Sequence, residues 1–401
     1  MRILHIGDIH PQAAGTYAGK LKIDPSTGYS IALTDCQLGL HACLDWERDH
    51  PCDLTVMGGD LWNTPHPTAA ELSLVHEFIR QLLLRMPVVI VAGNHDMEVN
   101  SLKVTALEPL RSLAKLMRDV SGPQSLHIMT APDRALVMTG AGLACVAGLP
   151  YPAKGRFQAS AEEQGEGAEV VLAKMNDGIR RIVEAMNGGI HKHGVNVFVG
   201  HGTVGTATVG EQPRSISHDL MIPLDVLEQY DYVALNHIHK HQQVGPNAWY
   251  SGSLLCQSFG EKDEPKGWCV ADVKKGQVPQ VAHIPNPHSR RFRDLTIAEV
   301  THTVRGDAEE SSDAVYRVVG EIAEADDPEA CLAIAKFEAT HPFTQNALTI
   351  RRAEERARDA GMTSILSEDE AVERVLRTVA PEAAIPSAMQ KHAEIRKEVA
   401  A

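Results

Sequence analysis

The sequence predicts an α/β protein built around a layered sheet, and three features lead to this prediction. Five short runs rich in Val, Ile and Leu indicate buried strands, at residues 2–6, 54–57, 88–92, 195–199 and 232–235. Apolar residues at helical spacing over 68–86 and 168–187 indicate helices between some of them. Alternation of strands and helices is typical of a sheet covered by helices.

The second half of the chain carries shorter elements. Strand-like pieces at 248–250, 268–273 and 280–284 are broken by Gly and Pro, and we expect them to form a second, mostly antiparallel sheet. Beyond residue 287, strands are expected at 292–295 and 315–319, with a helix over 328–337. From residue 344 the chain is acidic and helical, and capping patterns at Ser367 and Ser387 predict two final helices.

Composition narrows the class of protein. Of 401 residues, 43% are hydrophobic and 22% charged, which excludes disordered and collagen-like chains. No apolar run approaches the roughly 18 residues of a membrane span, and the N-terminus turns acidic too early for a signal peptide. Seven cysteines without a CxxC pair argue against a disulfide framework. We therefore expect a soluble, cytoplasmic protein with no membrane partner.

The net charge of −14 does not decide whether the partner is a nucleic acid. Residues 291–401 contain 14 Lys and Arg against 22 Asp and Glu, which is more than half of the deficit. A metal site in the first 290 residues would itself account for some of the remaining Asp and Glu residues.

Each strand of the first domain is followed by polar residues of the kind that bind metals. In chain order these are Asp8 and His10, Asp60, Asn94 with His95 and Asp96, His201, and Asn236 with His237 and His239. Open α/β sheets place their sites at the carboxyl ends of strands, so we expect these side chains to converge. Alone, the motifs at Asp8 and Asp60 could be turns or caps and His201 a structural histidine, whereas Gly93-Asn94-His95-Asp96 is fairly specific by itself; all five in order are highly specific.

The residue types indicate two divalent metal ions. Two Asp, one Asn and four His form a mixed oxygen and nitrogen set that suits Mn²⁺, Zn²⁺ or Fe²⁺. The set exceeds the needs of one four-coordinate ion, and paired metals are a standard device for hydrolysing phosphate esters. His95 is a candidate general acid. Asp96 is a candidate catalytic residue that would orient His95, or else a turn cap.

The ordered motifs resemble the calcineurin-like metallophosphoesterase superfamily and, within it, the SbcD group of nuclease subunits. The narrower resemblance rests on Gly59-Asp60-Leu61-Trp62, on the run Val89 to Asp96, and on Tyr232 to Lys240. It also rests on Tyr250 to Ser253 leading to Ser258-Phe259-Gly260-Glu261, a segment that plain phosphatases generally lack. The resemblance covers residues 1–275 well and the remainder in outline.

The resemblance implies a four-layer αββα sandwich and assigns the ligands. It places one metal on Asp8, His10, Asp60 and His239, and the other on Asp60, Asn94, His201 and His237. Asp60 would bridge the two ions, which would be Mn²⁺, and His95 would assist departure of the leaving oxygen.

The resemblance also implies a domain organisation and partners. Residues 1–287 would be the nuclease domain, 288–345 a small α+β capping domain that contacts DNA, and 346–401 helices that dock on an SMC-like coiled-coil ATPase. The expected activity is double-strand exonuclease and hairpin or single-strand endonuclease cleavage in DNA repair or recombination, by a homodimer within the complex.

Three features depart from the family pattern. Asn236 stands where the family usually has Gly, and Asn63 where many relatives carry a second active-site histidine. The loop over 11–29 is long and lacks the usual Leu-Gly and Arg. Its Lys20 and Lys22, and Arg214 in the Gly/Thr-rich loop 203–217, are candidate phosphate contacts or ordinary surface residues. Two other functions stay open: a stand-alone metallophosphatase or nucleotide phosphodiesterase, and a non-catalytic scaffold.

Overall fold

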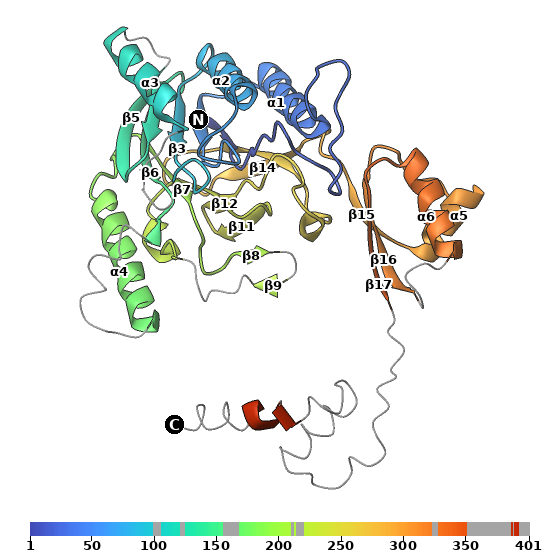
Figure 1. The fold of residues 1–401 in the computed structure, drawn as a ribbon. Coiled ribbons are helices and arrows are strands. Elements are labelled where there is room, and N and C mark those ends of the chain that lie inside the picture. The colour runs from blue at the N-terminus through green and yellow to red at the C-terminus, as the bar shows by residue number, and fades with distance from the viewer. Residues whose placement is uncertain are drawn as a thin grey trace. The chain divides into compact units, whose positions relative to one another are not determined.

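The first predicted strand is an inner strand of a six-stranded sheet in the computed structural model (Figure 1). The order of its strands is β14 (Gln280–Pro285), β13 (Gly267–Asp272), β1 (Arg2–Ile6), β2 (Leu54–Met57), β3 (Val88–Val91) and β4 (Leu126–Met129). Strands β1 to β4 are parallel, β13 is antiparallel to β1, and β14 is antiparallel to β13.

The predicted strands at 195–199, 232–235 and 248–250 belong to a second six-stranded sheet. The order of its strands is β11 (Gln242–Gly245), β12 (Ala248–Tyr250), β10 (Tyr232–Asn236), β7 (Val195–His201), β6 (Gly142–Leu149) and β5 (Asp133–Thr139). Strands β6, β7, β10 and β12 run parallel, with β5 and β11 antiparallel at the two edges.

The two sheets face each other across an apolar core, and helices cover their outer faces. Residues such as Val56 and Val91 from the first sheet pack with Val146 and Val199 from the second. The first sheet is covered by α1 (Ile31–Asp49), α2 (Ala69–Leu83) and α3 (Glu108–Val120). The second is covered by α4 (Ala168–Asn187) and the short η4 (Leu224–Leu227). The predicted four-layer αββα sandwich is confirmed.

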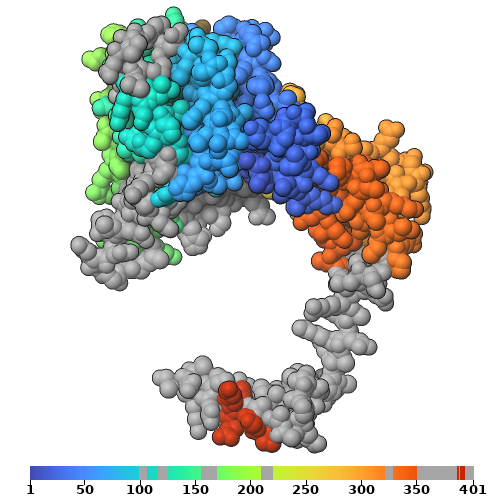
Figure 2. Space-filling model, turned by 45° about the horizontal axis from the view of Figure 1, so that its top comes forward, coloured from blue at the N-terminus to red at the C-terminus, as the bar shows by residue number. Residues whose placement is uncertain are grey.

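A small α+β module follows the sandwich. It consists of β15 (Phe292–Thr296), α5 (Ile297–Arg305), β16 (Val315–Ile322), α6 (Pro328–Thr340) and β17 (Thr344–Ile350). Tyr17 from the long loop 11–29 packs on Phe292 and Phe343, with ring centroids 6.1 and 5.5 Å away. Figure 2 shows this N-terminal segment, in dark blue, against the orange module. The module thus contacts the loop that follows His10.

The structure describes residues 1–98, 106–120, 125–154, 168–209, 212–213, 220–322, 328–350, 386–387 and 389–392. One compact unit contains Met1–Gly320 and Ala330–Ala347, and a second contains Glu321–Glu329 and Leu348–Ala401. The predicted helix at Ser367 lies outside the described residues, whereas 386–387 and 389–392 are helical. Among the described residues, no helix has the length and apolarity needed to cross a membrane.

The structure corrects one expectation about topology. The strands over 248–284 do not form a separate antiparallel sheet, because β12 joins the second sheet and β13 and β14 join the first. Each extends an existing hydrogen-bonded edge, which leaves fewer backbone groups unpaired than a new small sheet would.

Two short elements complete the sandwich. A two-stranded ribbon, β8 (Thr208–Val209) with β9 (Gln212–Pro213), follows β7, and the 3₁₀ turn η5 (Phe259–Glu261) follows β12.

Candidate metal centre

Four of the seven predicted metal ligands have a left-handed backbone. The φ angles are 46° at Asp8, 46° at His10, 51° at Asp60 and 100° at His237. Such angles are uncommon outside glycine and cost of order 1–3 kcal/mol, and they gather at functional sites. Among the described non-glycine residues, only Ala18 shares this property. The strained turns place each of these side chains at the sheet edge just after its strand.

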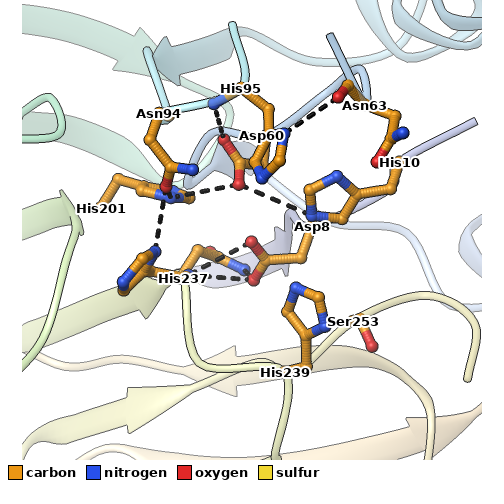
Figure 3. Close-up of polar contacts among 12 residues, drawn as sticks. Asp8, His10, Asp60, Asn63, Asn94, His95, His201, His237, His239 and Ser253 are labelled. Carbon is orange, nitrogen blue, oxygen red and sulfur yellow. Dashed lines mark hydrogen bonds and ion pairs between the residues drawn. The ribbon is translucent and has the colours of Figure 1, made fainter. Parts of the chain in front are cut away.

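Asp60 lies at the centre of the convergent side chains, as Figure 3 shows. One of its oxygens, Oδ2, is 3.5 Å from His10 Nε2 and 3.4 Å from His201 Nε2. The other, Oδ1, accepts a 2.8 Å hydrogen bond from the backbone N–H of His95. Because it faces histidines from both halves of the predicted ligand set, Asp60 has the position of a bridging carboxylate.

Asn94, His201 and His237 form the other side of the cluster. Asn94 Oδ1 lies 3.0 Å from His201 Nε2 and 3.0 Å from His237 Nδ1 (Figure 3). His201 Nδ1 donates to the carbonyl of Gly58 at 2.7 Å, which fixes the ring with Nε2 toward the site. Such outer hydrogen bonds set the direction of metal-binding histidines.

His239 is oriented by Glu261, a residue that the sequence resemblance includes only within the segment 258–261 and to which it gives no role. Its Nδ1 lies 2.9 Å from Glu261 Oε1, and the buried Lys266 Nζ lies 2.8 Å from Glu261 Oε2. Burial would raise the pKa of Glu261, but the hydrogen bond from His239 and the charge of Lys266 lower it to about 2. The carboxylate is therefore ionised at neutral pH and accepts a hydrogen bond from the Nδ1–H of His239. The lone pair of His239 is then on Nε2, where it could bind a metal ion.

We expect Glu261→Gln to weaken metal binding roughly 10–100-fold, since loss of an outer-shell partner of a ligand has effects of this size. The measurement is Mn²⁺ affinity by calorimetry. Glu264→Gln is the matched control, because Glu264 also pairs with Lys266, at 3.0 Å. Equal affinities for the Glu261 and Glu264 variants would remove this role from Glu261.

His95 is held by Asn63 and not by Asp96. The Nδ1–H of His95 donates to the carbonyl of Asn63 at 2.9 Å, so its Nε2 is free to carry or take a proton (Figure 3). A backbone carbonyl makes this contact, so the Asn side chain at position 63 does not disturb it.

Asp96 is a turn cap, which corrects its assignment as a candidate catalytic residue. Its buried carboxylate accepts backbone N–H groups of Asp60, Leu61, Trp62 and Gly93, at 2.8 to 3.3 Å. These bonds tie the turn after β2 to the turn after β3. Asp96 therefore holds the backbone from which Asp60 and Asn94 project.

Two of the three predicted phosphate contacts, Lys20 and Lys22, are not part of this cluster. Lys20 Nζ pairs with Glu338 Oε2 of α6 at 3.0 Å. Lys22 is exposed, and its carbonyl accepts from the N–H of Ile31. Arg214 lies outside the described residues.

The donors present fit a pair of divalent cations. In the part of the chain that the structure describes, three groups have ligand atoms within 4.8 Å of one another: Asp8, His10 and His239; His10, Asp60 and His95; and Asp8, Asp60 and His201. Both ring nitrogens of His10 are buried without a hydrogen-bond partner, and burial lowers its pKa to about 3, so the ring is neutral. A buried nitrogen lone pair with no partner is costly unless it binds a cation.

Two stacked sheets flanked by helices, with carboxylate, amide and imidazole ligands at the carboxyl ends of their strands, define an αββα metallohydrolase. The family model for calcineurin-like phosphoesterases matches residues 1–273, and the chain belongs to this family.

Three curated relatives are named as the SbcD component of the nuclease SbcCD. The Staphylococcus epidermidis protein is 26% identical over 259 residues, which are 63% of this chain and 63% of the relative. The Bacillus subtilis protein is 27% identical over 290 residues, which are 69% of this chain and 67% of the relative. The Staphylococcus saprophyticus protein is 26% identical over 231 residues, 56% of each chain. The chain thus spans between about half and two thirds of the length of these relatives.

The solved structures that align with this chain are less similar to it in sequence than the curated relatives. A dimetal phosphatase from Danio rerio aligns over 71% of this chain and 99% of its own, with a TM-score of 0.35 and 11% identity. A Thermus thermophilus protein aligns over 70% of this chain and 98% of its own, with a TM-score of 0.35 and 13% identity. The family assignment rests on the sequence match alone.

Proposed function

We propose that this chain is a two-metal phosphodiesterase that cuts DNA, and that it is the nuclease partner of an SMC-like coiled-coil ATPase. The position of Asp60 between His10 and His201 carries the two-metal part of the proposal. The DNA substrate and the ATPase partner are supported by the relatives that bear the SbcD name.

Each predicted ligand has a defined role in this proposal. Asp8, His10, Asp60 and His239 hold one ion, and Asp60, Asn94, His201 and His237 hold the other. Two ions at such a site stabilise charge on the phosphoryl oxygens and supply a nucleophile at neutral pH. His95, held through Nδ1 by Asn63, presents Nε2 to protonate the departing oxygen.

The proposal includes further properties that depend on the whole protein. The metal is Mn²⁺, the substrates are duplex ends, hairpins and single strands, and the protein acts in the cytoplasm as a homodimer within the complex. The small module, expected over residues 288–345 and extended to Ile350 by β17, is a capping domain that contacts DNA.

A comparison of substrates tests the proposal. With Mn²⁺ we expect hydrolysis of bis(p-nitrophenyl) phosphate and of labelled single-stranded DNA, and little hydrolysis of p-nitrophenyl phosphate. Turnover of either nitrophenyl ester without any cutting of DNA, with or without the ATPase, would identify a stand-alone metallophosphatase or nucleotide phosphodiesterase. No turnover of any of the three would identify a scaffold.

The C-terminal segment is proposed to dock on the ATPase. The helix that the sequence predicts after Ser367 would have only a short apolar face, too small to make an independent domain. We therefore expect it to pack on another surface. Since β17 ends at Ile350, the truncation that preserves the sheet removes residues 351–401. We expect this variant to keep its activity on single-stranded DNA but to lose co-purification with the ATPase and ATP-stimulated cutting of duplex ends. Full-affinity binding of the truncated chain to the ATPase would contradict the docking role.

A further inference from the structure

A chain of buried hydrogen bonds runs from Tyr232 to the metal ligand Asp8 through the unusual Asn236. Asn236 Nδ2 lies 2.9 Å from Asp8 Oδ2, and Asn236 Oδ1 lies 2.9 Å from His5 Nε2. His5 Nδ1 lies 2.8 Å from Tyr232 Oη. All four side chains are fully buried. Because β1 carries His5 and β10 carries Tyr232 and Asn236, the chain of bonds joins the two sheets.

Chemistry fixes the direction of every bond in this chain. The Ser251 hydroxyl donates to the carbonyl of Gly252 and therefore accepts from Asn236, so the amide N–H₂ of Asn236 faces Ser251 and Asp8 and its oxygen faces His5. His5 therefore carries its proton on Nε2, and its Nδ1 accepts from the Tyr232 hydroxyl. Burial lowers the pKa of His5 to about 4 and raises that of Tyr232 well above its usual value, which agrees with a neutral imidazole and a protonated phenol.

The network restrains Asp8 on one side. Asp8 Oδ2 accepts from Asn236 Nδ2 and, at 3.0 Å, from the backbone N–H of His237. The second amide hydrogen of Asn236 goes to Ser251 Oγ at 2.8 Å, so this amide is itself fixed at three points. A carboxylate held in this way keeps a single orientation toward the ligand cluster.

The surrounding glycines leave room for this side chain. A Cβ on Gly58 would lie 1.9 Å from Asn236 Oδ1, and a Cβ on Gly7 would lie 2.5 Å from Asn236 Nδ2. For both glycines, the three nearest atoms all belong to Asn236. The departure from the usual Gly at position 236 is therefore accommodated by its neighbours and is not a sign of a decayed site.

We propose that Asn236, held by His5 and Tyr232, is a positioning residue that fixes the Asp8 carboxylate for metal binding. The inference rests on the proposed metal centre but does not depend on DNA as the substrate. His5 acts only through Asn236, because Asn236 stands between it and Asp8.

The test is calorimetric titration of Mn²⁺ into the full chain. We expect Asn236→Gly to lower Mn²⁺ affinity about 10–100-fold, as for other outer-shell partners. Asn196→Gly is the matched control: Asn196 is also fully buried, near the start of β7, and bonds to the backbone of His191. This control should lower the melting temperature and leave Mn²⁺ affinity unchanged.

His5→Phe completes the experiment, because it removes the Nε2–H donor while leaving Asn236 in place. It should weaken Mn²⁺ binding in the native background and have no further effect in the Asn236→Gly background, the non-additivity expected of residues in one network. Should Asn236→Gly fail to fold, the weakened binding of His5→Phe alone supports the inference, and native affinity in that variant overturns it.

Native affinity in a folded Asn236→Gly variant, or equal effects of His5→Phe in both backgrounds, would also overturn the inference. Failure of the unmodified chain to bind Mn²⁺ would overturn the metal centre itself, and the inference with it. DNA cleavage enters none of these outcomes, so a wrong substrate would show separately.

Discussion

Replacement of Asp60 by Ala is expected to abolish metal binding and phosphodiester hydrolysis together. Its Oδ2 atom lies within 3.5 Å of His10 Nε2 and 3.4 Å of His201 Nε2, so each ion would lose a ligand. Its Oδ1 atom also accepts from the N–H of His95, so the proposed general acid would lose an anchor. The measurements are metal content by elemental analysis and hydrolysis of bis(p-nitrophenyl) phosphate.

Asp231→Ala is the matched control for Asp60→Ala. Asp231 is also a buried carboxylate, and it accepts the backbone N–H groups of Asn196 and Gly276 at 2.7 Å. It directly precedes β10, whereas the candidate ligands His237 and His239 follow that strand. The control should lower thermal stability and retain metal and activity. Two ions retained by Asp60→Ala would show that this carboxylate does not bridge them.

Replacement of His95 by Ala is expected to lower kcat roughly 10²–10⁴-fold, the usual contribution of a general acid, with metal content nearly intact. KM should change little, because the leaving group needs the proton only in the transition state. His66→Ala is a suitable control, since His66 is an exposed histidine between β2 and α2 that pairs with Glu98.

The His95→Ala variant also shows whether His95 is a proton donor or a metal ligand. The His95 ring lies 5.0 Å from the His10 ring between centroids, and His95, His10 and Asp60 form one of the convergent groups. Loss of metal from His95→Ala, in parallel with activity, would therefore make His95 a ligand and leave the general acid unassigned.

The convergence of the candidate ligands could be predicted from the sequence because it follows a local rule. Each candidate ligand comes soon after an apolar strand, and parallel strands deliver their carboxyl ends to one edge. The predicted bounds of β1, β2, α4 and β12 agree with the structure. The left-handed backbone at Asp8, His10 and Asp60 could not be predicted, since these residue types seldom adopt it without support from distant contacts.

Elements and residues that depend on distant partners were missed. Helix α1 was not predicted because buried acids interrupt its apolar face. Asp35 is neutralised by Arg290, with Nε to Oδ2 at 2.5 Å, and Glu47 by Arg85, with Nη1 to Oε2 at 2.6 Å. The hairpin of β5 and β6 was also missed, although its two strands are adjacent in the sequence.

Glu261 and Asn236 illustrate the same limit within the site. Glu261 stands 22 residues after His239, and only the path of the intervening chain brings the two together. Asn236 was identified as a departure from the family pattern, but its bond to His5, 231 residues away, could not be inferred from spacing.

Crystals grown with Mn²⁺ and recorded near its absorption edge give the most direct test of the two-metal centre. The anomalous difference map should show two peaks roughly 3.5–4 Å apart, the spacing of two-metal sites, with Asp60 between them. One peak should lie against Asp8, His10 and His239, and the other against Asn94, His201 and His237. A single peak, or no peak at these residues in crystals that hold Mn²⁺ elsewhere, would contradict the two-metal centre.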